Sequence, residues 1–319
     1  MKTKIAALLL LFSILSNAQF VKNHGQLKVI GTQLSDQNNE PISLRGVSLG
    51  WHNWWPRFYN KETVKWIHQD FKANVIRAAI GVDADENCYL KNPSESKAKL
   101  DAVVQAAIKE SIYVIIDWHS HKTYTKEAVA FFTEVSKKYG KYPNVIYEIF
   151  NEPEHQTWEE VKSYSQDVIK AIRANDSDNI ILVGNPSWDQ DIHLVAENPL
   201  KDFDNIMYTM HFYAATHEKW LRDRVDYAMQ KGIPVFVSES AGTQASGDET
   251  INYAAWQEYV DWMESKKISW VTWSISDKDE TCSMLFPTAS SKGKWKAQDL
   301  KDSGKKTKAY LNLLNNQNH

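Results

Sequence analysis

The sequence predicts an α/β protein, a single (β/α)8 TIM barrel, over residues 19–319. Three observations predict this fold: eight short apolar runs, amphipathic stretches between them, and a first run that is not followed by a glycine-rich phosphate turn. Between about residue 25 and about residue 315, the sequence has no tandem repeat and no Pro- or Ser-rich linker. We therefore expect one domain with its active site at the carboxyl ends of the strands.

The eight expected strands are continuous apolar runs, which is typical of parallel strands that are covered on both faces. They are residues 43–48, 74–80, 113–118, 145–150, 179–183, 206–211, 235–238 and 270–274. Between the runs, apolar residues recur at i, i+3, i+4 and i+7, most clearly within residues 100–108 and 256–263. Each such helix should pack one face on the strands.

The first 18 residues have the layout of a secretory signal peptide: two lysines, an apolar run over residues 5–15, then Ser16-Asn17-Ala18. We expect cleavage after Ala18 and a secreted protein, either extracellular or periplasmic. A membrane anchor is the alternative, but the apolar run is well short of the roughly 20 residues that span a bilayer. No other segment of the sequence could span one, so the mature protein should have no membrane span.

The charge balance favours a neutral ligand. Lys and Arg number 37 against 40 for Asp and Glu, and a net charge of -3 gives no reason to expect nucleic acid or anionic lipid as a partner. The 13 Trp residues are an unusually large number, and those near strand ends are candidates for stacking on sugar rings. We expect a monomer.

The two cysteines, Cys88 and Cys282, leave two interpretations open. A secreted protein can use such a pair as a disulfide, and two partly buried thiols are the alternative. Because one follows the second expected strand and the other follows the eighth, we expect both near the same rim of the barrel.

Nearly every expected strand ends in polar or aromatic side chains. In chain order these are Arg77, Asp117-Trp118-His119, Asn151-Glu152, His211-Phe212-Tyr213, Glu239 and Trp273. Glu152 and Glu239 close the fourth and seventh strands and could face each other across the barrel mouth. Two facing carboxyl groups are what glycoside hydrolysis requires, one protonated and one ionised. The residues alone do not assign the two roles.

Eight segments in this order closely resemble the bacterial endoglucanases of glycoside hydrolase family 5, from about residue 27 to about residue 315. They are Leu44-Arg45-Gly46, residues 74–79 (NVIRAA), 113–119 (YVIIDWH), 142–148 (YPNVIYE), 151–153 (NEP), 211–214 (HFYA), 237–239 (VSE) and 277–280 (DKDE). The resemblance implies a secreted retaining endo-β-1,4-glucanase with a β-1,4-linked polysaccharide as substrate and neither cofactor nor metal.

The resemblance also implies roles for single residues. Glu152 should be the acid/base and Glu239 the nucleophile, with Asn151 on the sugar 2-hydroxyl. Arg77 and Tyr213 should contact the nucleophile and keep it ionised. The remaining expected contacts are His211 beside the acid/base, His119 and Trp273 at the cleaved sugar, Trp54 and Trp188 as stacking platforms on opposite sides of the cleavage point, and Lys278 and Glu280 two sugars toward the non-reducing end.

Two departures from the family pattern concern loops around the site. Ser240-Ala241-Gly242 follows the nucleophile where relatives commonly have Trp-Gly or Tyr-Gly, and Gly50 stands where many relatives carry a histidine. His52 could replace that histidine only if the loop is rearranged. Both departures could alter substrate binding, and neither changes Glu152 or Glu239.

Three alternatives remain at this point. The set His119, His121, His211 and Asp117 could bind a metal for hydrolysis. The scaffold could also carry a non-catalytic glycan-binding protein, although both carboxyl groups are present. Finally, a family 5 enzyme could prefer mannan or xyloglucan as a retaining endo-β-mannanase or xyloglucanase.

Overall fold

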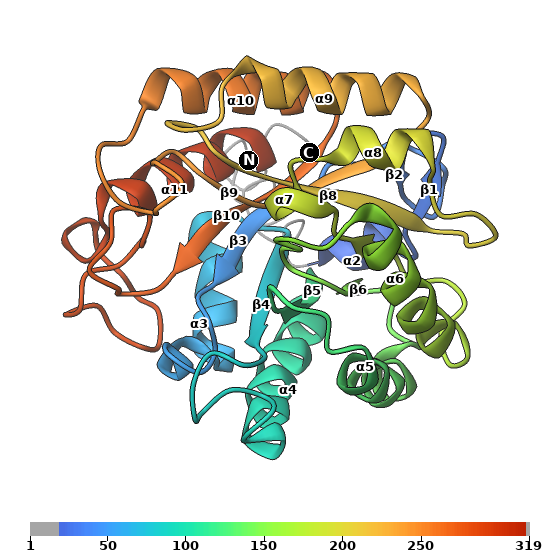
Figure 1. The fold of residues 1–319 in the computed structure, drawn as a ribbon. Coiled ribbons are helices and arrows are strands. Elements are labelled where there is room, and N and C mark those ends of the chain that lie inside the picture. The colour runs from blue at the N-terminus through green and yellow to red at the C-terminus, as the bar shows by residue number, and fades with distance from the viewer. Residues whose placement is uncertain (1–18, 317–319) are drawn as a thin grey trace, which may run out of the picture.

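The barrel consists of eight parallel strands in a computed structural model that describes residues 19–316, so the predicted signal peptide lies outside the described residues. The strands close in chain order, and the last of them pairs with the first (Figure 1). They are β3 (Arg45–Leu49), β4 (Val75–Gly81), β5 (Tyr113–His119), β6 (Val145–Glu148), β7 (Ile181–Val183), β8 (Ile206–Tyr213), β9 (Val235–Ala241) and β10 (Ser269–Ile275). Each coincides with one predicted run, which confirms the (β/α)8 prediction.

Helices surround the barrel as an outer ring (Figure 1). They are α3 (Lys61–Trp66), α4 (Pro93–Glu110), α5 (Thr125–Tyr139), α6 (Trp158–Arg173), α8 (Ile192–Glu197), α9 (Lys219–Gln230), α10 (Tyr253–Ser265) and α11 (Asp302–Asn315). The short turn α7 (Pro186–Asp189) lies inside this ring, beside β8 (Figure 1). Short turns of helix complete the outer layer: η2 (Pro56–Phe58), η3 (Ile67–Phe71) and η4 (Ala297–Asp299). The two clearest helical patterns fall in α4 and α10, whose apolar faces are buried as predicted.

Two apolar cores hold this arrangement together because successive side chains of a strand point to opposite faces. Ile76, Ala78 and Ile80 of β4 point outward and pack in the core between strands and helices. Val75 of the same strand belongs to a smaller core that fills the amino-terminal half of the barrel together with Tyr113 and Ile115. The carboxyl-terminal half holds polar side chains and a small apolar cluster that includes Ala79, Ala241 and Trp273.

A small hairpin caps the amino-terminal end of the barrel. It consists of α2 (Phe20–His24), β1 (Lys28–Ile30) and β2 (Gln33–Ser35), and the two strands pair antiparallel. Tyr113 Oη, at the start of β5, donates to the Gly25 carbonyl at 2.7 Å, and the Val29 amide donates to Asn205 Oδ1 at 3.0 Å. The hairpin is not among the predicted elements because strands of three residues are too short to show a pattern. With this end closed, the site lies at the other end.

No helix among residues 19–316 is both long enough and apolar enough to cross a membrane.

Candidate active site

A bulge in β9 brings two consecutive side chains into the barrel mouth. The pairing of β8 with β9 advances by two residues on β8, from Thr209 to His211, but by three residues on β9, from Phe236 to Glu239. Such an extra residue re-aims the side chains next to it. Ser238 and Glu239 therefore both reach the polar network, where regular alternation would have turned one of them outward.

Arg77, on β4, is the centre of the network and is fully buried. Its guanidinium donates to Glu148 at 2.7 and 3.2 Å, to Glu239 Oε2 at 3.0 Å and to Asn151 Oδ1 at 2.6 Å. It also lies 2.9 Å from Asp117 Oδ2. One planar cation thus orders carboxyl groups from three strands and an amide from the loop after β6, as the fork geometry of Arg allows. Because the Asn151 oxygen accepts from Arg77, its NH2 group is left as the donor.

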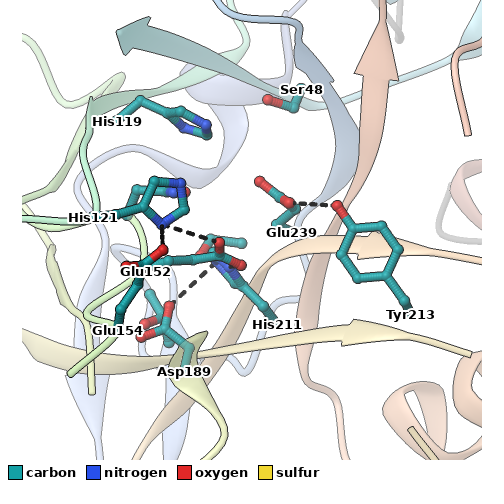
Figure 2. A network of polar contacts seen from close by, with 12 residues as sticks. Ser48, His119, His121, Glu152, Glu154, Asp189, His211, Tyr213 and Glu239 are labelled. Atoms are coloured by element: carbon teal, nitrogen blue, oxygen red, sulfur yellow. Dashed lines mark hydrogen bonds and ion pairs between the residues drawn. The ribbon is translucent and has the colours of Figure 1, made fainter. Parts of the chain in front are cut away.

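Glu239 is held by two donors. Besides Arg77, Tyr213 Oη donates to Glu239 Oε1 at 2.8 Å (Figure 2). Burial and the neighbouring charge of Glu152 raise the pKa of Glu239, while His211, Arg77 and Tyr213 act in the opposite direction. Burial and the charge of Glu239 also raise the pKa of Tyr213 well above its usual range, so its hydroxyl stays protonated and remains a donor.

Glu152 lies between two imidazoles (Figure 2). His211 Nδ1 is 2.9 Å from Glu152 Oε1, and His121 Nδ1 is 3.6 Å from Glu152 Oε2. Burial acts to raise the pKa of Glu152. The hydrogen bond and the charge of His211 have the larger combined effect, so the pKa of Glu152 is lowered. The opposite shift occurs on His211, where burial is outweighed by Asp189, Glu148 and Glu152, which raise its pKa well above the usual range.

The hydrogen bonds and pKa shifts around His211 indicate where its ring protons lie. Ser238 Oγ donates to Glu148 Oε1 at 2.7 Å and lies 2.9 Å from His211 Nε2. Because its single proton points to Glu148, Ser238 accepts from a protonated Nε2. Against the opposing effect of burial, Arg77 and His211 lower the pKa of Glu148 to about 2, so this acceptor is ionised. Because the pKa of His211 is raised, its ring also keeps a proton on Nδ1, and this proton lies on the line to Glu152 Oε1.

The two carboxyl groups of Glu152 and Glu239 face each other. Together with a ring nitrogen of His211, each presents one oxygen within 4.8 Å of the others. Among the described residues this is the group whose geometry would suit a cation, and the alternative set of His119, His121, His211 and Asp117 does not converge in this way. His119 Nδ1 is instead bonded to Asp117 Oδ2 at 2.6 Å.

Two hollows meet at Glu152 and Tyr213. The first hollow, of about 290 Å³, is lined by Trp51, Trp54, Trp55, His119, His121, Glu239, Ala245, Ser246, Trp273, Ser274, Ser276, Lys278 and Glu280. The second hollow, of about 500 Å³, is lined by Ser187, Trp188, Gln190, His211, Thr216, His217 and Ala245. An extended ligand that occupies both hollows would pass directly over the carboxyl pair.

Aromatic and charged side chains form the walls of the first hollow. Trp273 and the His119 ring stack at 5.2 Å and 5°, and Trp54, which is 47% exposed, lies 4.7 Å from Trp51. Lys278 Nζ donates to Glu280 Oε1 at 2.8 Å at the edge of the hollow. Trp188, 40% exposed, stands in the second hollow. The structure thus places Trp54 and Trp188 in different hollows that meet at Glu152.

The two departures in sequence have structural counterparts. His52 is buried away from the site, with Nε2 2.8 Å from Ser96 Oγ and Nδ1 accepting from the Gly81 amide at 2.9 Å, so it does not replace the missing histidine. β9 continues through Ser240 to Ala241, and a Cβ on Gly242 would come within 2.3 Å of the Trp256 ring. Glycine is thus the residue that fits there.

Six residues of the cluster were not among the predicted site residues. Glu148 had a usable signal, since it is a charged residue inside an otherwise apolar run. Ser238, Trp51 and Asp189 had none, because a bulge, a loop and a short turn bring them to the site. Asp117 and His121 were given a role only as ligands in the metal alternative.

Cys88 and Cys282 are both buried free thiols, so they form no disulfide with each other.

Comparisons with known proteins agree with this geometry. The family Cellulase (glycosyl hydrolase family 5) matches residues 35–279. The chain is 44% identical to an endoglucanase of Clostridium saccharobutylicum, over 94% of this chain and 69% of the relative. It is 41% identical to Endoglucanase 5 of Pectobacterium carotovorum subsp. carotovorum, over 95% of this chain and 60% of the relative. Both relatives are therefore longer than the part that the chain matches.

Solved structures are similar over nearly the whole chain. A structure from Cytophaga hutchinsonii has a TM-score of 0.92 at 42% identity and covers 94% of this chain and 98% of its own. The catalytic domain of the Thermobifida fusca endoglucanase Cel5A has a TM-score of 0.88 at 31% identity, over 92% of this chain and 99% of its own.

Proposed function

Because the chain belongs to glycosyl hydrolase family 5 and is an endo-β-1,4-glucanase of that family, we propose that it is a secreted enzyme that retains anomeric configuration, with Glu239 as nucleophile and Glu152 as acid/base. The observation that carries this proposal is the facing carboxyl pair, whose oxygens approach within 4.8 Å. Retaining glycosidases hold their two carboxyl groups about 5 to 5.5 Å apart, against about 6.5 to 9.5 Å in inverting enzymes, which need room for a water.

In the first step, Glu239 attacks the anomeric carbon while the bond from that carbon to the glycosidic oxygen breaks. A carboxylate with one oxygen on Arg77 and the other on Tyr213 is fixed in orientation, which favours attack from one face. The leaving oxygen takes its proton from Glu152. The product is a glycosyl ester of Glu239 with inverted configuration.

The proton for the leaving group comes from the His211–Glu152 pair. This pair shares one proton along the Nδ1–Oε1 line, so Glu152 can be low in pKa in the free site and still deliver a proton. When the leaving oxygen approaches Glu152, the proton moves from Nδ1 to the carboxyl group and onward to the sugar. This accounts for an acid whose own pKa is not raised.

In the second step, Glu152 acts as base. It removes a proton from water, which attacks the same carbon, and the bond to Glu239 breaks. The second inversion restores the β configuration. Arg77 and Tyr213 stabilise the carboxylate that is released.

The substrate would be a β-1,4-glucan chain lying across both hollows. Trp273 with His119, and Trp54, supply flat surfaces in the first hollow, while Lys278 and Glu280 supply hydrogen bonds for hydroxyl groups. Trp188 offers a platform in the second hollow. Asn151, with its NH2 group left as donor, is suited to bind the 2-hydroxyl of the cleaved sugar.

Two variants test the division of roles. Glu239→Ala should lose turnover of every substrate, because no covalent intermediate can form. Glu152→Ala should stall on cellotetraose but still react with 2,4-dinitrophenyl β-cellobioside, whose leaving group needs no proton. Added azide should accelerate this variant and give a β-glycosyl azide. Glu159→Ala, an exposed carboxylate on α6, is the matched control and should behave like the unmodified enzyme.

Two outcomes would contradict the proposal, and a third would support it independently. An inverted product from the unmodified enzyme, followed by NMR early in the reaction, would exclude the retaining mechanism. If azide fails to rescue Glu152→Ala, the acid/base assignment falls. If azide rescues Glu239→Ala to an α-glycosyl azide, the nucleophile assignment is supported independently.

Substrate preference is tested on a panel of polysaccharides. Carboxymethyl cellulose should be cut internally, and cello-oligosaccharides should yield cellobiose and cellotriose. Higher activity on mannan or xyloglucan would contradict this preference. For secretion, the amino-terminal residue of the exported protein should be Gln19, and size-exclusion chromatography should give the mass of a monomer.

A further inference from the structure

A left-handed turn separates the second hollow from the buried network. Ser187, Trp188 and Asp189 have φ angles of 58°, 56° and 62° in succession. This conformation costs roughly 1–2 kcal/mol for each residue with a side chain. Backbone hydrogen bonds hold it in place, from the Trp188 amide to the Pro153 carbonyl at 2.9 Å and from the Asp189 amide to the Asn185 carbonyl at 3.1 Å. The turn is thus tied to the tripeptide that contains Glu152.

The turn directs two consecutive side chains to different sides. Trp188 stands in the second hollow, whereas Asp189 is fully buried. Asp189 Oδ1 accepts from the Asn185 amide at 2.6 Å, and Oδ2 lies 3.4 Å from His211 Nε2 (Figure 2). Within the part of the chain that the structure describes, Oδ2 has no hydrogen-bond partner. Its nearest charged neighbour is the imidazole that shares a proton with Glu152.

Ionisable groups face His211 from every neighbouring element. They are Asp117 and His119 from β5, Glu148 and Glu152 from β6 and the loop that follows it, Asp189 from α7, His217 from the loop after β8, and Glu239 from β9. Arg77 neutralises part of this charge, because it binds Glu148 and Glu239 directly. Among the described residues, Asp189 has no Lys or Arg at ion-pair distance, and the cation that its charge meets is the His211 imidazole.

We propose that Asp189 is a positioning residue for the catalytic proton, and that its buried carboxylate keeps the His211–Glu152 pair protonated at alkaline pH. The proposal rests on the proposed function of Glu152 as acid/base. It gives the strained turn a role, since the same three residues present a sugar platform and place a carboxyl group behind His211.

The direction of the effect follows from the charges. Burial is the largest cause that raises the pKa of Asp189, to about 8. Asp189 is therefore neutral at lower pH and ionises as the solution becomes alkaline, in the range where the pair would begin to lose its proton. A new negative charge 3.4 Å from the imidazole increases its affinity for the proton. The alkaline limb of activity is thereby moved to higher pH.

The test compares Asp189→Asn with Asp191→Asn. Asparagine keeps the shape and an acceptor for the Asn185 amide but cannot ionise. Asp191, on the same segment, pairs with Arg224 at 2.7 Å and does not face His211. With cellotetraose, whose leaving group needs a proton, the alkaline limb of kcat/KM should move to lower pH by about 1 unit in Asp189→Asn. It should not move in Asp191→Asn.

A second substrate separates proton supply from structural damage. With 2,4-dinitrophenyl β-cellobioside, which needs no acid, the alkaline limb of Asp189→Asn should coincide with that of the unmodified enzyme. An unchanged limb with cellotetraose, or an equal shift with both substrates, would overturn the proposal. If azide accelerates Glu152→Ala while Asp189→Asn shows no shift of its alkaline limb, the role of Asp189 is refuted and the proposed function stands. If azide does not accelerate Glu152→Ala, the acid/base role of Glu152 is refuted, and with it the proposed function.

A measurement on the unmodified enzyme covers the case in which Asp189→Asn does not fold. In 13C NMR of the aspartate carboxyl carbons, one signal should titrate near pH 8. The His211 ring nitrogens should respond at the same pH. A titration curve without such an aspartate signal would refute the proposal.

Discussion

Tyr213→Phe removes one hydrogen bond from the proposed nucleophile and leaves the ring in place. Tyr213 Oη donates to Glu239 Oε1 at 2.8 Å, and this bond favours the ionised carboxylate. A hydrogen bond to a charged group contributes about 1.5 to 3 kcal/mol, which corresponds to a change of about 1 to 2 units in pKa. Because Tyr213 lines both hollows, water can take the place of the lost hydroxyl. We therefore expect the lower value, about 1 unit.

The sign follows from the state that reacts. Glu239 must be ionised to attack, and loss of the donor raises its pKa, so the acidic limb of kcat/KM should move to higher pH. 2,4-Dinitrophenyl β-cellobioside isolates this limb because its leaving group needs no proton from Glu152. On the falling part of both profiles, the variant should be about tenfold slower than the unmodified enzyme.

The matched control is Tyr208→Phe on the same strand. Tyr208 lies in the amino-terminal half of β8 and accepts from the Leu200 amide at 2.9 Å, so the variant should lose about 1 to 3 kcal/mol of stability. Its acidic limb should stay in place. If the acidic limb of Tyr213→Phe coincides with that of the unmodified enzyme, or moves to lower pH, the hydrogen bond from Tyr213 does not keep Glu239 ionised.

Three further predictions concern stability, substrate binding and the thiols. Arg77→Met leaves buried carboxyl groups without their cation and should lower the free energy of unfolding by about 3 to 5 kcal/mol. Calorimetry should then show a fall in Tm on the order of 10 °C, and an unchanged Tm would contradict a stabilising role of the Arg77 network. Trp188→Ala should raise KM for cellotetraose about fivefold, for about 1 kcal/mol of lost stacking, and a changed pH profile with an unchanged KM would argue against a platform. Cys88 and Cys282 should resist a thiol reagent in the native enzyme and both react in denaturant, because both are buried; rapid native labelling would refute this.

The barrel could be predicted from the sequence because its parallel strands are covered on both faces. Continuous apolar runs such as residues 113–118 indicate a buried strand, whichever residues of the neighbouring strand they pair with. The amino-terminal hairpin could not be predicted, because three-residue strands carry no periodicity and its contacts, such as Val29 with Asn205, join residues 176 positions apart in sequence. Long-range pairing of this kind is visible only in three dimensions.

The site divides in a similar way. Glu152 and Glu239 were found because they stand at strand ends, where a barrel places its chemistry. Ser238 could not be predicted because regular alternation turns one of two consecutive residues outward, and the bulge in β9 breaks that rule. Asp189 could not be predicted because nothing in the sequence marks three successive left-handed residues.

The contacts of Arg77 have a consequence for how the chain finds its register during folding. Its partners come from the neighbouring strands β5 and β6 and from β9, which is far away in the sequence and reaches Arg77 only when the ring is closed. If one of these strands slipped by a single residue, the carboxyl group it carries would turn to the other face. A buried guanidinium that lost such a partner would cost several kcal/mol. The same charges that serve the reaction therefore also select the correctly closed barrel over its slipped alternatives, a selection that uniformly apolar strands alone would make less sharply.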